Sequence, residues 1–255
     1  MKKNLLPLFL IFLASCGTTN FYQVYKAKAE GGKTSDKEIV FEDKYCRVTY
    51  SLWAPGGNVG FSFYNKTDED LTIDLSRTFF VLNGFTYDYF QDRMYTHSSS
   101  SGVSVASPAN PYYYRSVSSV ASGTSVSYST AYNEKEQRTV PPGVSVQITE
   151  FRIVGSRYIN CDLKKFPSRT KIKTVSFDKT NSPFKFQNLI TFTSKGTDYR
   201  MDNSFYVAEV TNYPSSMIMH GVSKSDCGTS LPRPFYEFND PSADKFYFEY
   251  FMNSK

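Results

Sequence analysis

The stretch "NVGFSFYNKTDEDLTIDLS", residues 58–76, carries the pattern that predicts the fold of this chain. On both sides of the polar loop 65–70, apolar residues alternate with smaller or polar ones. The apolar positions are Val59, Phe61, Phe63, Leu71, Ile73 and Leu75. Period-two alternation places one side of a β-strand in a core and the other in water. We therefore predict two strands, joined by the loop as a hairpin.

Strand-like patterns continue in both directions. In "CRVTYSLW", residues 46–53, Cys46 shares a face with Val48, so we expect Cys46 to be buried. Asn83-Gly84 supplies the positive φ angles of a type I′ turn and predicts a second hairpin. Further strand-like runs occupy residues 144–148, 171–177, 189–193, 204–210 and 245–251. Residues 204–213 also fit one short helix, but their β-forming residues favour a strand.

Many short strands with Pro, Gly and Asn turns predict an all-β fold, specifically an immunoglobulin-like β-sandwich. It carries a long Ser-rich insertion and a β-rich C-terminal extension. The expected division is a signal peptide at residues 1–15, then an anchor, tether and first strand at 16–36. The sandwich follows at 37–165, and a β-rich part packed on it at 166–255. The Cys…Trp…Cys pattern of immunoglobulin domains is absent from the sequence.

The Ser-rich insertion covers residues 97–130, with 13 serines and no acidic residue. It has too little apolar surface for its own core, so we expect an insertion between strands, in part a ribbon. Tyr112, Tyr113 and Tyr114 lie within it. On a loop, tyrosines can stack on sugar rings or enter a partner's surface. Folding back over the sandwich edge is the alternative.

The N-terminus has the layout of a signal peptide: Lys2 and Lys3, an apolar segment to Ala14, then small residues. This segment is too short for a bilayer span of roughly 20 residues. Its end, Leu13-Ala14-Ser15-Cys16, resembles the lipobox of bacterial lipoproteins. The resemblance implies cleavage before Cys16 and modification of its thiol with a diacylglycerol, whose acyl chains include fatty acids such as palmitate.

The expected partner is therefore a membrane, bound through the N-terminal lipid. Gly17 replaces the aspartate that retains well-studied Gram-negative lipoproteins at the inner membrane, so the resemblance implies the outer membrane. Periplasmic and outward-facing placements both stay open. Without Lys2 and Lys3, the 29 basic residues fall to 27 against 24 acidic ones, a mild charge that gives no support for nucleic-acid binding.

Three cysteines remain after Cys16. Their odd number allows one disulfide at most, and Cys46 with Cys161 is the expected pair, leaving Cys227 accessible. Their spacing fits no zinc or C-x-x-C motif, so we predict no metal and no cofactor.

Catalytic motifs are weak throughout. His97 and His220, the two histidines, stand outside any G-x-S-x-G context, and surface or packing roles are favoured for both. The acidic loop 68–70 lacks calcium-ligand spacing and is typical of a solvated turn.

The segment "FYNKTDEDLTIDLSRTFFVLNGFTYDYF", residues 63–90, resembles uncharacterised β-sandwich lipoproteins of gut-type Gram-negative anaerobes. This resemblance implies no activity. The leading hypothesis is a non-enzymatic, membrane-tethered envelope protein with a binding or structural role, whose partner is an envelope protein or a glycan. A glycan-binding surface module and a hydrolase with an unlocated site are the alternatives.

Overall fold

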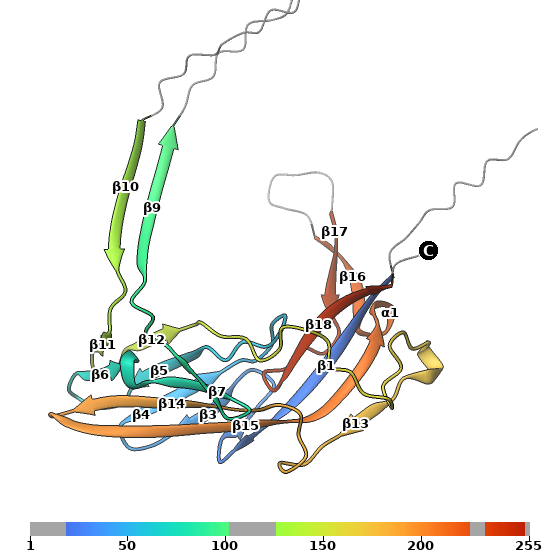
Figure 1. The fold of residues 1–255 in the computed structure, drawn as a ribbon, viewed down its shortest axis with the longest axis horizontal. Helices are drawn as coiled ribbons and strands as arrows, with labels where there is room; N and C mark the ends of the chain where they lie inside the picture. Colours follow the sequence, from blue (N-terminus) through green and yellow to red (C-terminus); the bar gives the residue numbers. More distant parts are fainter. Residues whose placement is uncertain (1–18, 102–125, 225–232, 253–255) are drawn as a thin grey trace, which may run out of the picture.

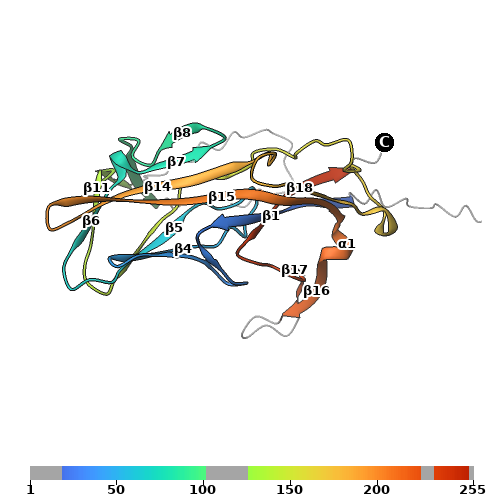
Figure 2. The same cartoon turned by 90° about the horizontal axis from the view of Figure 1, so that it is seen from below.

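The computed structural model describes residues 19–101, 126–224 and 233–252. Within these ranges the chain is almost entirely antiparallel β-structure, arranged as a sandwich of two sheets (Figures 1 and 2). The prediction of an all-β sandwich is confirmed. Both sheets are large: nine strands form one and five the other among the described residues.

The larger sheet follows the order β11-β6-β14-β15-β1-β18, with β7, β8 and β13 attached beside this path. Its strands are β1 (Thr19–Glu30), β6 (Leu71–Asp74), β7 (Phe79–Leu82), β8 (Phe85–Asp88), β11 (Gln137–Val140), β13 (Thr174–Ser176), β14 (Lys185–Ser194), β15 (Thr197–Pro214) and β18 (Lys245–Met252). The smaller sheet contains β2 (Lys33–Thr34), β3 (Ile39–Glu42), β4 (Cys46–Tyr50), β5 (Phe61–Asn65) and β12 (Ser145–Ile148).

Two ribbons project from the sandwich (Figure 1). One pairs β9 (Met94–Ser101) with β10 (Val126–Asn133), and the other pairs β16 (Met219–Lys224) with β17 (Arg233–Phe238). The first confirms that the Ser-rich insertion is in part a ribbon. Short helical turns are η1 (Leu75–Arg77), η2 (Arg169–Lys171) and α1 (Ser215–Ile218).

The first described strand, β1, lies inside the larger sheet, between β15 and the terminal strand β18. Tyr25 pairs with Val210 of β15 on one side and with Phe246 of β18 on the other. Residues 166–255 therefore do not form a separate layer on a sandwich of 37–165, because they supply three long strands of the sandwich itself. Strand alternation shows where strands lie but not which distant strand each one joins.

The loop at residues 65–70 is not a hairpin, so that prediction was wrong. β5 belongs to the smaller sheet and β6 to the larger one, and the loop carries the chain between them. The buried Asn65 amide fixes this crossing: its Nδ2 donates to the carbonyls of Glu69 (2.6 Å) and Val140 (2.8 Å). Its Oδ1 accepts from the Thr67 amide at 2.9 Å. These bonds satisfy backbone groups that a buried crossing would otherwise leave unpaired.

The hairpin at Asn83-Gly84 is confirmed, because β7 and β8 pair directly across it. Asn83 has φ 50° and Gly84 has φ 85°, the left-handed values that a type I′ turn requires.

A buried polar network joins the two sheets through the Tyr50 hydroxyl. Tyr50 on β4 accepts hydrogen bonds from the side-chain amides of Asn203 on β15 (2.8 Å) and Asn188 on β14 (3.4 Å). Asn188 also donates to the Val59 carbonyl at 2.9 Å and accepts from the Tyr89 hydroxyl at 3.0 Å. Around this network the core is mostly aromatic and aliphatic. Polar groups buried in this way set one relative position of the sheets.

Cys46 is buried, as its place in the strand pattern predicts, but it is not bonded to Cys161. Both cysteines are free, and Cys161 is exposed. Cys46 of β4 lies opposite Asn65 of β5, whereas Cys161 lies in the loop after Tyr158, and Tyr158 contacts β1. The prediction of a disulfide between Cys46 and Cys161 was therefore wrong. Cys227 lies outside the described residues.

Replacement of Tyr50 by Phe tests the network. Without the hydroxyl, buried amide groups of Asn188 and Asn203 lose their shared acceptor, so we expect a loss of about 1–3 kcal/mol in the free energy of unfolding. Tyr64→Phe is the control, because Tyr64 is half-buried and its hydroxyl makes no hydrogen bond to a described residue. Its expected effect is within about 0.5 kcal/mol. Equal denaturation midpoints for the two variants would contradict a stabilising network.

Candidate functional site

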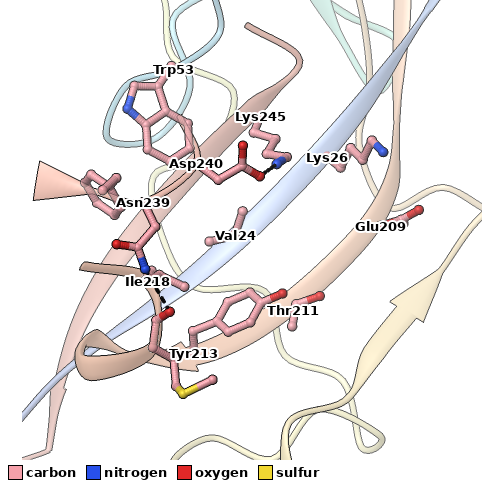
Figure 3. Close-up of a pocket in the computed structure, with 12 residues that line it drawn as sticks. Val24, Lys26, Trp53, Glu209, Thr211, Tyr213, Ile218, Asn239, Asp240 and Lys245 are labelled. Atoms are coloured by element: carbon pink, nitrogen blue, oxygen red, sulfur yellow. Dashed lines mark hydrogen bonds and ion pairs between the residues drawn. The ribbon is translucent and has the colours of Figure 1, made fainter. Parts of the chain in front are cut away.

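A pocket with a volume of about 390 Å³ lies over β1 and β15 (Figure 3). Its wall combines apolar and charged side chains from five segments of the chain. The lining residues are Val24, Lys26, Trp53, Glu209, Thr211, Tyr213, Met217, Ile218, Phe238, Asn239, Asp240 and Lys245. Such a mixture of aromatic surface and a few polar groups is typical of small-ligand sites.

The alternation of side chains along β1 determines which residues form the floor of the pocket. On β1, Val24 and Lys26 point to the pocket while the intervening Tyr25 is fully buried, stacked on Phe246 at 4.6 Å between ring centroids. Lys26 lies opposite Glu209 of β15 in the strand register, directly before the register shift between Lys26 and Ala27. The two opposite charges therefore occupy neighbouring strands on one face of the sheet.

One side of the pocket is built by the turn after β15. Pro214 has φ −70°, and the chain leaves the sheet there and forms the single turn α1. After the β16–β17 ribbon, Asn239 closes the base: its backbone N–H donates to the Ile218 carbonyl at 2.9 Å. Its side-chain Nδ2 donates to the Met217 carbonyl at 3.1 Å. The ribbon base and α1 are thereby held together beside the pocket.

The opposite side is an aromatic cluster around Trp53. Its ring centroid lies 4.9 Å from that of Phe238 and 5.1 Å from that of Tyr247. Trp53 reaches this place because the segment after it runs along β18, where the Gly56 N–H donates to the Tyr247 carbonyl at 2.7 Å. Gly56 has φ 79°, and a Cβ atom there would lie 2.6 Å from the Val154 carbonyl oxygen. Only glycine fits this turn.

The charges of the pocket are unevenly paired. Asp240 forms an ion pair with Lys245 (Figure 3). Lys26 and Glu209, in contrast, form no ion pair within the described part of the chain. Two charges of opposite sign thus remain available on the pocket wall.

Tyr22, which contacts both Phe238 and Tyr247, extends the aromatic cluster behind the pocket. Burial, together with its hydrogen bond to Glu249, raises the pKa of Tyr22 to about 12. The Tyr22 hydroxyl stays protonated at any physiological pH and donates to Glu249 Oε1 at 2.8 Å. The cluster is therefore a neutral aromatic wall, suited to packing rather than to proton transfer.

The predicted site residues lie elsewhere. Cys16, Tyr112, Tyr113 and Tyr114 fall outside the described residues. His220 is exposed, and its Nδ1 lies 2.8 Å from Asn239 Oδ1. Sequence reasoning missed the pocket, because its residues come from distant segments. The one available signal was Trp53, the sole tryptophan of the chain.

Across residues 19–101, 126–224 and 233–252, no group of three or more His, Cys, Asp or Glu side chains is arranged to hold a metal ion. Over the same ranges, no helix has the length and apolar character needed to cross a membrane.

Comparison of the chain with known protein families, curated proteins and solved structures found no significant match.

Replacement of Asn239 by Ala tests how the pocket is closed. Loss of the bond to the Met217 carbonyl should let the ribbon base open locally, while the core of the sandwich is untouched. We expect amide hydrogens of β16 and β17 to exchange at least about tenfold faster. The amides of β14, measured in the same sample, are the internal control and should not change. If β16 and β17 exchange as in the wild type, Asn239 does not hold the pocket wall.

Proposed function

We propose that this protein is a lipid-anchored binding protein of the bacterial cell envelope, attached to the outer membrane through Cys16. The lipobox-like sequence Leu13-Ala14-Ser15-Cys16 carries this proposal. β1 begins at Thr19, so only Gly17 and Thr18 separate the expected lipid from the sandwich. A chain this short reaches at most about 10 Å, and the body would sit directly at the membrane.

The pocket over β1 and β15 supports a binding role. Its aromatic side offers a flat apolar surface, and Lys26 and Glu209 offer a donor and an acceptor without a competing partner among the described residues. A ligand with an apolar face and polar or zwitterionic edges matches this arrangement. Charge-assisted hydrogen bonds to the two residues would orient it.

Glycan binding is the second candidate. The Trp53 ring beside Thr211, Asn239 and Asp240 combines an aromatic surface with hydrogen-bonding side chains, which fits the apolar face and hydroxyl edge of a sugar ring. Tyr112, Tyr113 and Tyr114 remain a proposed second stacking surface for the same class of ligand.

The lipid anchor is tested by Cys16→Ser. Because the acyl-accepting thiol is removed, we expect no incorporation of radiolabelled palmitate and loss of the mature protein from the membrane fraction. Ser15→Ala, which keeps a small residue before the cysteine, is the control and should be labelled like the wild type. Palmitate entering the Cys16→Ser protein at the wild-type level would exclude this anchor.

Ligand class is tested with the fluorescence of Trp53, which is the only tryptophan and lines the pocket. The chain is titrated with a panel of oligosaccharides and a panel of short peptides, and we expect a saturable change with one class. Lys26→Met should raise the Kd at least about tenfold, since a charge-assisted bond is lost.

Lys28→Met is the matched control for Lys26→Met, because it removes the same charge from an exposed position two residues further along β1. The same titration is repeated with Tyr112, Tyr113 and Tyr114 all changed to Ala. If the fluorescence response to saccharides is lost in this variant, the glycan site lies in the Ser-rich insertion and not in the pocket. A pocket without a binding role would leave Trp53 emission unchanged with both panels.

A further inference from the structure

The end of the larger sheet where β1 begins carries a concentration of positive charge. Residues 151–173 contain seven basic residues and one acidic residue, Asp162. The basic residues are Arg152, Arg157, Lys164, Lys165, Arg169, Lys171 and Lys173. None of the seven forms an ion pair with an acidic residue in the part of the chain that the structure describes.

This concentration is specific to the segment. The chain without its signal peptide has 27 basic and 24 acidic residues, so outside the segment 20 basic residues (27 less 7) are outnumbered by 23 acidic ones (24 less 1). The body is thus slightly acidic, with one strongly basic segment. The electric field of such an uneven charge distribution orients a protein with its basic side toward an anionic surface.

Buried hydrogen bonds fix the basic segment to the sheet. Gln23 of β1 accepts from the Tyr158 N–H at 2.6 Å and donates to the Tyr158 carbonyl at 3.0 Å. Asn212 of β15 donates to the Lys164 carbonyl at 3.0 Å, and the Tyr250 hydroxyl of β18 donates to the Lys165 carbonyl at 2.5 Å. Three strands therefore hold the backbone of the segment, while the Lys164 and Lys165 side chains stay exposed.

The segment lies beside the start of β1. The Phe166 ring is 5.1 Å from the ring of Phe21, the third residue of that strand. η2, the start of β1 and the end of β18 lie at the same end of the molecule in both views (Figures 1 and 2). The proposed lipid at Cys16 would therefore place this end against the bilayer.

Exposed apolar side chains accompany the charges. Ile159 in the basic segment is 77% exposed, and Phe251 and Met252 at the end of β18 are 51% and 37% exposed. Phe251 and Met252 pair with Asn20 and Thr19, the first residues of β1. Apolar side chains beside basic ones match the boundary between headgroups and acyl chains.

We propose that this end of the sheet is a membrane-docking surface for anionic phospholipid headgroups. We name it the basic end and define it by Arg157, Ile159, Lys164, Lys165, Arg169 and Phe251. Its lysines and arginines contact lipid phosphates, and its apolar side chains enter the interface. This placement rests on the proposed anchor, and the basic end supplies the second signal that stable attachment requires besides a lipid.

The test uses the chain from Gly17 onward, without lipid, so that the anchor plays no part. Every described strand pairing lies between Thr19 and Met252, and this chain keeps them all. Sedimentation is measured with vesicles of phosphatidylcholine alone and with vesicles containing phosphatidylglycerol. We expect binding to the anionic vesicles only, and weaker binding as the salt concentration rises from roughly 0.05 M to roughly 0.5 M.

The variant with Lys164, Lys165 and Arg169 changed to Gln should bind anionic vesicles about 100-fold more weakly, since each basic residue near such a surface contributes about one factor of five. Lys33, Lys37 and Lys135 changed to Gln form the control. They are exposed and remove the same charge from other parts of the body, so binding should stay within about twofold of the wild type. Thermal melts verify that both variants are folded.

Equal binding of the two triple variants, or wild-type binding that ignores lipid charge, would overturn the docking surface. Palmitate labelling at Cys16 is measured separately, so failure of the anchor and failure of the basic end are distinguishable. If Cys16 is acylated but the chain from Gly17 onward does not bind anionic vesicles, the proposed function stands and the docking surface is excluded.

Discussion

The pairing of β1 between β15 and β18 is the constraint on which the rest of the structure depends. A strand at the beginning of the described chain is held by two strands near its end, with Asn20 bonded to Glu249 across 229 positions. This pairing places Tyr25 in the core and Lys26 in the pocket, because neighbouring residues of a strand face opposite sides. It also fixes the end of the sheet at which Thr19, the first described residue, lies.

Buried amides convert this pairing into a defined three-dimensional arrangement. Gln23 bonds Tyr158 and Asn212, and so holds the loop that carries the basic end. The Tyr50 hydroxyl accepts a hydrogen bond from Asn203 and so fixes the position of the smaller sheet relative to the larger one. Each amide would be costly to bury without its partners, and the networks therefore select one packing over others. The pocket and the basic end are built by the same few strands.

Local patterns predicted the local structure well. Alternation identified the strands and the burial of Cys46, and Asn83-Gly84 identified its hairpin, because both signals act over a few residues. The crossing after Asn65 was predicted as a hairpin, since alternation is the same whether the next strand joins the same sheet or the opposite one. The pocket was missed because Trp53 and Glu209 meet only through long-range pairing, which no local pattern encodes.

The central claim is that the anchored end of the larger sheet faces the membrane, and the exposed thiol of Cys161 can test it. The acylated protein, with Cys227 changed to Ser, is labelled at Cys161 with a fluorophore in vesicles that carry a lipid-bound quencher. A second protein, with Cys161 and Cys227 changed to Ser, is labelled at Lys195→Cys, in the β14–β15 turn at the opposite end of the molecule (Figure 1). We predict strong quenching at position 161 and little at 195. Equal quenching, or stronger quenching at 195, would contradict the account.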